Sequence, residues 1–214
     1  MQPKVVIFLA VALVGIALDQ ATKYWVRTSE AINNGGIDVI PHALQLVHAE
    51  NPGAAFGMLG SLPTAARLGV FGLFTLVAVG VIVDLFRRLP PKDVFLSTTL
   101  GLILSGALGN GIDRLHKSTV TDFIRFYTDN EGWVTWLEAK IGMAEYPSFN
   151  VADINLVIGV VLFMVHYLFL EDRSADKATP REDDPAALAE TTGGDADDGA
   201  PPDDTSDEPT AHTA

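Results

Sequence analysis

The sequence predicts a mainly α membrane protein, a bundle of four transmembrane helices followed by a disordered C-terminal tail. Two observations predict this class. Four apolar stretches within residues 1–170 approach the length needed to cross the hydrocarbon of a bilayer. Acidic residues gather after those stretches, where residues 171–214 contain 14 Asp and Glu against 3 Lys and Arg. Residues 1–170 carry 13 acidic and 11 basic side chains, so the formal net charge of −13 belongs almost wholly to the tail.

The predicted spans cover Lys4–Val26, Ala65–Phe86, Val94–Asp113 and Ala152–Leu170. The first span begins like a signal peptide, because a lysine precedes its apolar run. No small-x-small cleavage motif follows that run, and the helical pattern continues through Asp19, Lys23 and the interfacial pair Tyr24-Trp25. We therefore expect the first span to be retained.

The loop between the second and third spans indicates the orientation of the bundle. Arg87, Arg88 and Lys92 place three cations in that short loop, which is typical of the cytoplasmic side. Alternation of the spans then predicts that both termini are cytoplasmic, and that residues 27–64 and 114–151 form loops on the outer face. The membrane domain is expected to cover residues 1–173.

The tail, residues 174–214, is rich in Asp, Pro, Gly, Ala and Thr and contains no aromatic residue. Such a segment buries too little apolar surface to offset the entropy of ordering, so we predict that it is disordered. It is either a solvated extension or an acidic interaction tail.

Two outer-face segments carry secondary-structure patterns. Apolar and β-branched residues alternate over Ile37–Asn51, which predicts one or two short strands. In Gly132–Tyr146 the side chains of Trp133, Trp136, Leu137 and Ile141 fall near helical spacing, as in an amphipathic interfacial helix.

The composition excludes several kinds of chemistry. The chain has no cysteine, so disulfides, a cysteine nucleophile and thiolate metal sites are all excluded. Its five histidines are scattered without metal-ligand spacing. Ser118 and Thr119 beside Lys117 are poorly placed as a nucleophile and base, because sequence neighbours do not face each other. We predict no cofactor, no metal and no nucleic-acid partner.

The unusual polar residues all fall at the predicted outer face. Asp19 and Lys23 are four residues apart on the first span, close enough to pair. Gly106, Asn110 and Arg114 also step by four, which aligns a small residue, an amide and a guanidinium on one helix face. This face serves either as a polar clamp between helices or as a direct contact to substrate. Neighbouring Asp113 is expected to be structural, as an ion-pair partner.

Two further carboxylates lie beside the spans. Asp122 lies in the loop after the third span, and Asp153 begins the fourth span three residues after Asn150. Asp153 alone would be interpreted as a helix cap. Together, the two carboxylates could share one proton, because neighbouring like charges raise one pKa. Two carboxylates that share one proton are the catalytic groups of an aspartic protease.

Four sequence blocks, in this order, resemble the bacterial lipoprotein signal peptidases (signal peptidase II). They are Asp19–Lys23, Asn51–Gly57, Gly109–Arg114 with Asp122 following, and Phe149–Asp153. The resemblance covers roughly residues 5–170 and implies an inner-membrane aspartic endopeptidase. Its substrates would be prolipoproteins bearing a diacylglyceryl-cysteine, cut just before that cysteine, with membrane lipid around the site.

The resemblance also implies roles for individual residues. Asp122 and Asp153 match the catalytic pair, and the Ile37–Asn51 strands match a small antiparallel β-sheet on the outer face. The matching supporting residues are Asp19, Lys23, Asn51, Gly106, Asn110, Arg114, Asn150 and Ala152. One departure is the interval between the two aspartates, which is long for the family and points to an insertion over Asn130–Pro147.

Two other function classes compete with the protease. A small proton-coupled transporter would use intramembrane carboxylates as a relay, and should distribute charge through the bilayer depth. A structural four-span assembly factor should tolerate replacement of the aspartates by asparagine.

Overall fold

The computed structural model describes residues 2–53, 62–142 and 147–170, all within one compact unit, Met1–Leu170. The predicted disordered tail lies outside the described residues. So do residues 54–57 of the Asn51–Gly57 block and residues 143–146 of the predicted insertion.

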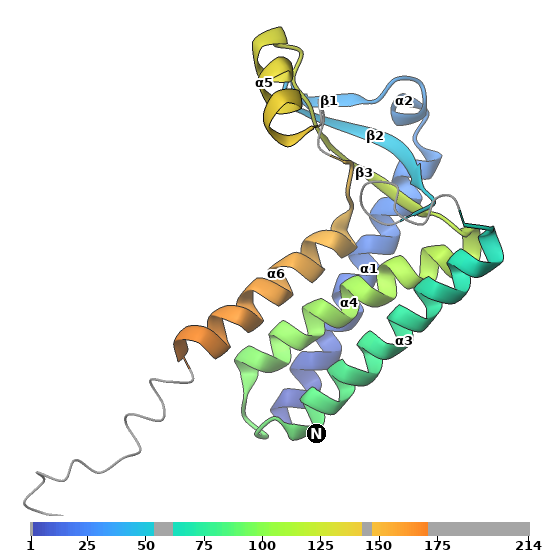
Figure 1. Ribbon diagram of the computed structural model, residues 1–214. Helices are drawn as coiled ribbons and strands as arrows, with labels where there is room; N and C mark the ends of the chain where they lie inside the picture. The colour runs from blue at the N-terminus through green and yellow to red at the C-terminus, as the bar shows by residue number, and fades with distance from the viewer. Residues whose placement is uncertain (1, 54–61, 143–146, 171–214) are drawn as a thin grey trace, which may run out of the picture. The chain divides into compact units, whose positions relative to one another are not determined.

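Four of the described helices are long and apolar enough to cross a membrane, as predicted. They are α1 (Pro3–Thr28), α3 (Thr64–Arg88), α4 (Val94–Lys117) and α6 (Val151–Val165), which continues as a π-helical turn over His166–Leu170. Figure 1 shows α4 packed between its neighbours, and it contacts α1, α3 and α6. A four-helix membrane bundle is therefore confirmed.

Local capping residues define where the helices begin and end. Asp93 caps α4, because its carboxylate accepts a hydrogen bond from the backbone N–H of Leu96 at 2.9 Å. At the other end of α4, Ser118 adopts a left-handed conformation, with φ of 65°. Lys4 in the first turn of α1 is buried and donates to the carbonyl oxygen of Leu89 at 2.6 Å, which joins α1 to the end of α3.

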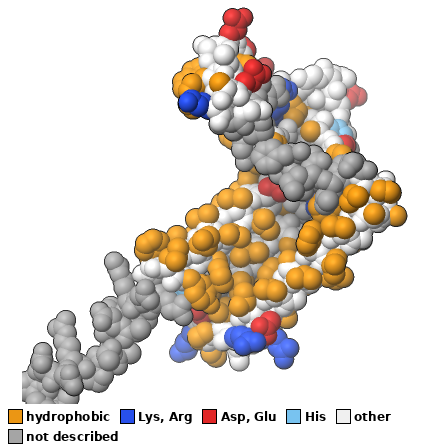
Figure 2. All heavy atoms as spheres, in the orientation of Figure 1, with side chains coloured by type: hydrophobic (Ala, Val, Ile, Leu, Met, Phe, Trp, Pro, Cys, Tyr) orange, Lys and Arg blue, Asp and Glu red, His pale blue; other side chains and the backbone are white. Residues whose placement is uncertain are grey.

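The buried interior of the bundle is small, and many apolar side chains of its helices point outward. Its buried cluster comprises Phe8, Ala12, Ile82, Leu100 and Leu104. On the face shown in Figure 2, hydrophobic side chains are spread over the surface of the helices. In water such a surface would be unfavourable, but against lipid it is the expected exterior of a transmembrane bundle.

A three-stranded antiparallel sheet lies at one end of the bundle (Figure 1). Its strands are β1 (Ile37–Ile40), β2 (Leu44–Asn51) and β3 (Val120–Phe126), in that order. The prediction of short strands over Ile37–Asn51 is confirmed as two strands. The third strand, β3, was not predicted, and it carries Asp122.

The sheet is joined to the bundle by its own buried cluster. Phe123 of β3 packs with Val26 near the end of α1 and with Ile32 of the short helix α2 (Glu30–Asn33). Val151 at the start of α6 packs against the same cluster. The cluster therefore ties β3 to the ends of two membrane helices. Between β3 and α6 lies one more helix, α5 (Glu131–Ile141), inside the predicted insertion.

Candidate active site

Asp122 lies on β3 with its side chain almost completely buried, at 4% exposure. One carboxylate oxygen accepts a hydrogen bond from the side-chain amide of Asn51 at 3.0 Å. The other accepts from the side-chain amide of Asn150 at 2.7 Å. Asn51 ends β2, the neighbouring strand, so the sheet itself positions the first of these donors.

Asp153 occupies the first turn of α6, where it has two roles. Its Oδ2 accepts from the backbone N–H of Asn150 at 3.0 Å, while the Asn150 side chain accepts from the backbone N–H of Asp153. This reciprocal pair is a capping box, in which Asn150 is the N-cap and Asp153, at the third helical position, is its partner. Its other oxygen, Oδ1, accepts from the side-chain amide of Asn110 at 2.8 Å, which links the cap to α4.

A chain of two amides connects the carboxylates of Asp122 and Asp153. The Nδ2 of Asn150 donates to Asp122 and also to the Oδ1 of Asn110, at 3.1 Å. The same Oδ1 accepts from Lys23 Nζ at 3.0 Å, so both of its lone pairs are occupied. This saturation orients the Asn110 amide with its N–H groups toward Asp153. Asp122 thus accepts from Asn150 and Asp153 accepts from Asn110, and a hydrogen bond joins these two asparagines.

Backbone pairing explains how residues so far apart in sequence meet. The N–H groups of Phe123 and Ile124 both donate to the Phe149 carbonyl, at 3.0 and 2.9 Å, and Phe149 N–H donates back to Ile124. The chain entering α6 is thus held along β3. Asn150, the next residue, is consequently placed beside Asp122.

The surroundings of Asp122 favour its protonated form. Burial raises the pKa of its carboxyl, the hydrogen bonds from Asn51 and Asn150 lower it, and the negative charge of Asp153 adds to the rise. Together these effects move the pKa from 3.8 to about 6. A carboxyl with this pKa can hold or release a proton near neutral pH.

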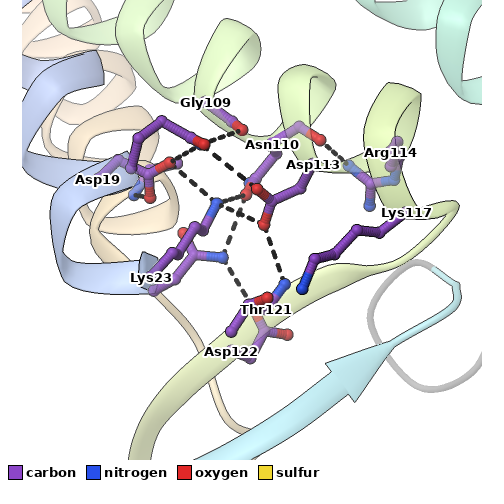
Figure 3. A network of polar contacts seen from close by, with 12 residues as sticks. Asp19, Lys23, Gly109, Asn110, Asp113, Arg114, Lys117, Thr121 and Asp122 are labelled. Carbon is purple, nitrogen blue, oxygen red and sulfur yellow. Dashed lines mark hydrogen bonds and ion pairs between the residues drawn. The ribbon is translucent and has the colours of Figure 1, made fainter. Parts of the chain in front are cut away.

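Behind the amide chain lies a buried cluster of charges, drawn in Figure 3. Lys23 is fully buried and lies 2.9 Å from Asp19 and 3.3 Å from Asp113. The predicted pairing of Asp19 with Lys23 and the predicted ion pairing of Asp113 are both confirmed. Asp19 also accepts from the backbone N–H of Ala152 at 2.9 Å, which fixes α1 against the start of α6. Because every member has a partner, the cluster can remain charged while buried.

Two residues of this network, Arg27 and Thr121, were not predicted from the sequence. Arg27, one turn beyond Lys23, lies 3.0 Å from Asp113 and donates from Nε to the hydroxyl of Thr121 at 2.9 Å. The backbone N–H of Thr121 donates to Asp113 at 3.1 Å. Together these contacts hold β3 one residue before Asp122. Only the i,i+4 spacing from Lys23 could have pointed to Arg27.

The predicted face of Gly106, Asn110 and Arg114 acts partly as a clamp between helices. A Cβ on Gly106 would lie 2.4 Å from the carbonyl oxygen of Ala152, so glycine allows α4 and α6 to approach closely. Arg114 donates to the carbonyl of Gly53 at 3.4 Å, and its guanidinium stacks 4.1 Å from the centre of the Phe71 ring. Arg114 therefore reaches the segment after β2, while Asn110 contacts Asp153.

An apolar groove of about 420 Å³ opens beside the network. Its described lining consists of Phe126, Phe149, Asp153, Ile154, Val157 and Ile158. Among these residues Asp153 is the one ionisable group, so an apolar molecule lying in the groove would pass next to that carboxylate. Nowhere in the described part of the chain do three His, Cys, Asp or Glu side chains gather closely enough to hold a metal ion.

The fold and this network together define a multi-pass membrane protein with a buried carboxylate site at one end of its helices. The family model described as signal peptidase (SPase) II matches residues 11–169. The chain belongs to the signal peptidase II family, a family of membrane proteases.

Individual relatives support the same assignment. The lipoprotein signal peptidase of Maridesulfovibrio salexigens is 37% identical over 162 residues, covering 75% of this chain and 95% of the relative. That of Geobacter sulfurreducens is 38% identical over 176 residues, covering 82% and 99%. A solved structure, described as a bacterial membrane enzyme determined by the in meso method at 2.3 Å resolution, matches with a TM-score of 0.62 and 31% identity. That match covers 81% of this chain and 93% of the solved one.

Proposed function

We propose that the protein is an aspartic endopeptidase that removes the signal peptide from diacylglyceryl-modified prolipoproteins, cutting just before the lipidated cysteine. Asp122 and Asp153 are the proposed catalytic pair. The observation that carries this assignment is the position of Asn150, which donates to both carboxylates, from its side chain to Asp122 and from its backbone to Asp153.

In the proposed mechanism one carboxyl of the pair is protonated and the other is ionised, with a water molecule between them. The ionised carboxylate takes a proton from water as the oxygen attacks the scissile carbonyl carbon, and the protonated carboxyl donates to the carbonyl oxygen. The resulting gem-diol collapses when the C–N bond breaks and a proton passes to the amine of the cysteine. Because coupled carboxyls titrate as a pair, neither role is assigned to one residue alone.

The supporting residues would act by holding the pair in place. Asn51, Asn110 and Asn150 donate to the carboxylates, and Lys23 orients Asn110. Further out, Asp19 and Ala152 join α1 to α6, while Gly106 permits the close packing of α4 on α6. Arg114, whose guanidinium donates to the Gly53 carbonyl, would donate in the same way to a backbone carbonyl of the bound peptide.

The apolar groove beside Asp153 supports a lipid-bearing, apolar substrate. It lies along α6, a membrane span, with Val157 59% exposed and Ile158 46% exposed on its wall. An acyl chain or an apolar signal peptide moving within the bilayer could therefore reach the carboxylate without crossing water.

We further propose that the protein lies in the bacterial inner membrane, with both termini cytoplasmic and the carboxylate pair at the outer face. The cations of the loop between α3 and α4 support this orientation. Membership of the signal peptidase II family favours a protease over a proton-coupled transporter or an assembly factor.

The test is cleavage of a diacylglyceryl-modified precursor by the purified protein, compared with cleavage of the unmodified precursor. We expect only the lipidated precursor to be cut, and Asp122→Asn and Asp153→Asn each to abolish cutting. Asp84→Asn is the matched control, because Asp84 is an exposed carboxylate paired with Arg88 at the far end of α3. Full activity in either dyad variant would refute the mechanism, and equal loss in the control would favour a charge relay.

A further inference from the structure

The helix α5 is a well-delimited element within the segment that joins β3 to α6. Asn130 caps its start, accepting from the backbone N–H of Trp133 at 3.2 Å, and Gly142 ends it with φ of 74°. In the view of Figure 1, α5 and α2 appear at opposite ends of β1. None of its described side chains belongs to either buried cluster. The described side chains of α5 therefore do not serve to pack the protein core.

That surface is dominated by two tryptophans. Trp133 is 59% exposed and Trp136 is 50% exposed, and their rings meet edge to face at 5.8 Å. With Asn130 and Gly132 they line a shallow hollow. Two neighbouring exposed indoles form a large apolar area with polar N–H groups, the combination that is enriched at membrane–water boundaries.

The charges of α5 are arranged as in a helix lying in the membrane interface. At 100° per residue, Glu131 and Glu138 fall together on the face opposite Trp133. Lys140 falls between the two tryptophans, where its aliphatic stem can lie along apolar surface while the ammonium reaches water. One face of α5 is thus suited to water and the other to the headgroup region of a bilayer.

The connection to α6 limits how far α5 can lie from the start of that membrane span. Gly142 and Asn150, the cap of α6, are eight positions apart in the sequence, which limits their separation to about 28 Å even for a fully extended chain. The groove beside α6 is lined by Phe126 and Phe149, which flank α5 in the sequence, five positions before Glu131 and seven after Gly142. Both ends of α5 are therefore tethered by short stretches of chain to residues of the apolar groove beside a membrane span.

We propose that α5 is a membrane-interface anchor, with Trp133 and Trp136 inserted into the headgroup region of the lipid bilayer beside α6. The attraction is not electrostatic, because Glu131 and Glu138 outnumber Lys140 on the helix. Binding should therefore not require anionic lipid. This anchor would hold the segment between the two aspartates against the membrane surface.

The test measures tryptophan fluorescence of the full chain in nanodiscs that contain one copy each. The Trp25→Phe variant leaves only Trp133 and Trp136 as tryptophans, since the chain has three. Brominated phosphatidylcholine is expected to reduce their emission about two-fold relative to the unbrominated lipid, with little quenching by aqueous acrylamide. The Trp133→Phe/Trp136→Phe variant, which keeps Trp25 at the end of α1, is the control for a membrane-boundary indole.

Strong acrylamide quenching without bromolipid quenching would overturn the proposal, since the indoles would then lie in water. Quenching that appears only in anionic lipid, or only when several copies share one vesicle, would overturn it equally. Quenching only in anionic lipid would indicate charge-driven binding, and quenching only with several copies would indicate a contact between copies. The readout involves no proteolysis, so its failure would leave the proposed peptidase function untouched.

Discussion

Asn150 donates its side-chain amide to Asp122 at 2.7 Å, and this contact joins the first turn of α6 to the sheet. The same residue caps α6 and holds Asp153 through its backbone N–H. One asparagine therefore places two carboxylates that lie on different secondary-structure elements. The geometry of the proposed catalytic pair depends on a helix cap.

Replacing Asn150 should separate these two roles. Asn150→Ala removes both the cap and the bridge, so we expect a loss of about 1 kcal/mol in stability and a fall in cleavage on the order of 100-fold. Asn150→Ser keeps a capping oxygen but is too short to bridge, so its stability should stay near that of the wild type while cleavage remains low. Thermal unfolding and cleavage of a lipidated precursor measure the two effects. Equal recovery of both in Asn150→Ser would contradict the bridging role.

The raised pKa of Asp122 predicts how activity depends on pH. If the pair must hold one proton, kcat/KM should fall as pH rises above about 6, where Asp122 becomes ionised. The hydrogen bond from Asn51 lowers this pKa, so Asn51→Leu should move the descending limb to higher pH. Glu50→Gln is the control, because Glu50 neighbours Asn51 but pairs with His48, Thr119 and Thr121. A limb that stays in place in Asn51→Leu would show that Asp122 does not determine it.

The free energy of unfolding should also depend on the protonation of Asp122. The pKa of Asp122 in the folded protein, about 6, lies above its ordinary value of 3.8, so the folded chain binds the proton more tightly. The stability from this group is fully present below pH 3.8 and is lost as pH rises through about 6. Asp122→Asn removes the titration, and should flatten the thermal unfolding temperature over this interval.

The membrane spans could be predicted from the sequence because apolar runs of that length are rare outside lipid-spanning helices. The Asp19–Lys23 pair could be predicted as well, since i,i+4 spacing on a helix needs no knowledge of the rest of the fold. The strand β3 could not, because Val120, Thr121, Asp122 and Phe123 are all buried and show no alternation. The contact between Arg27 and Thr121 was equally hidden, because 94 residues separate the two in sequence.

Gly106 tests whether close helix packing supports the pair. A Cβ at this position would lie 2.4 Å from the Ala152 carbonyl and 2.9 Å from the Cβ of Leu156, so Gly106→Ala must push α6 away from α4. The Asn110–Asp153 hydrogen bond should lengthen, and we expect a loss of cleavage approaching 100-fold. Gly80→Ala is the matched control, because the added methyl at that position on α3 meets nothing within 4 Å. Comparable losses in both variants would point to a general effect on the helices.

Lys23 tests the energetics of the buried charge cluster. Lys23→Met leaves Asp19 without a cation partner among the described residues, whereas Asp113 keeps Arg27 at 3.0 Å. An uncompensated buried carboxylate costs about 3–5 kcal/mol, so the thermal unfolding temperature should fall sharply. The double variant Lys23→Met/Asp19→Asn removes that charge. The amide oxygen introduced at position 19 can still accept the hydrogen bond from the backbone N–H of Ala152. We expect it to regain much of the lost stability but not the activity, since Asn110 still lacks the ammonium that orients it. If the double variant were no more stable than Lys23→Met, the cost would lie in the lost packing of the lysine side chain and not in the unpaired charge.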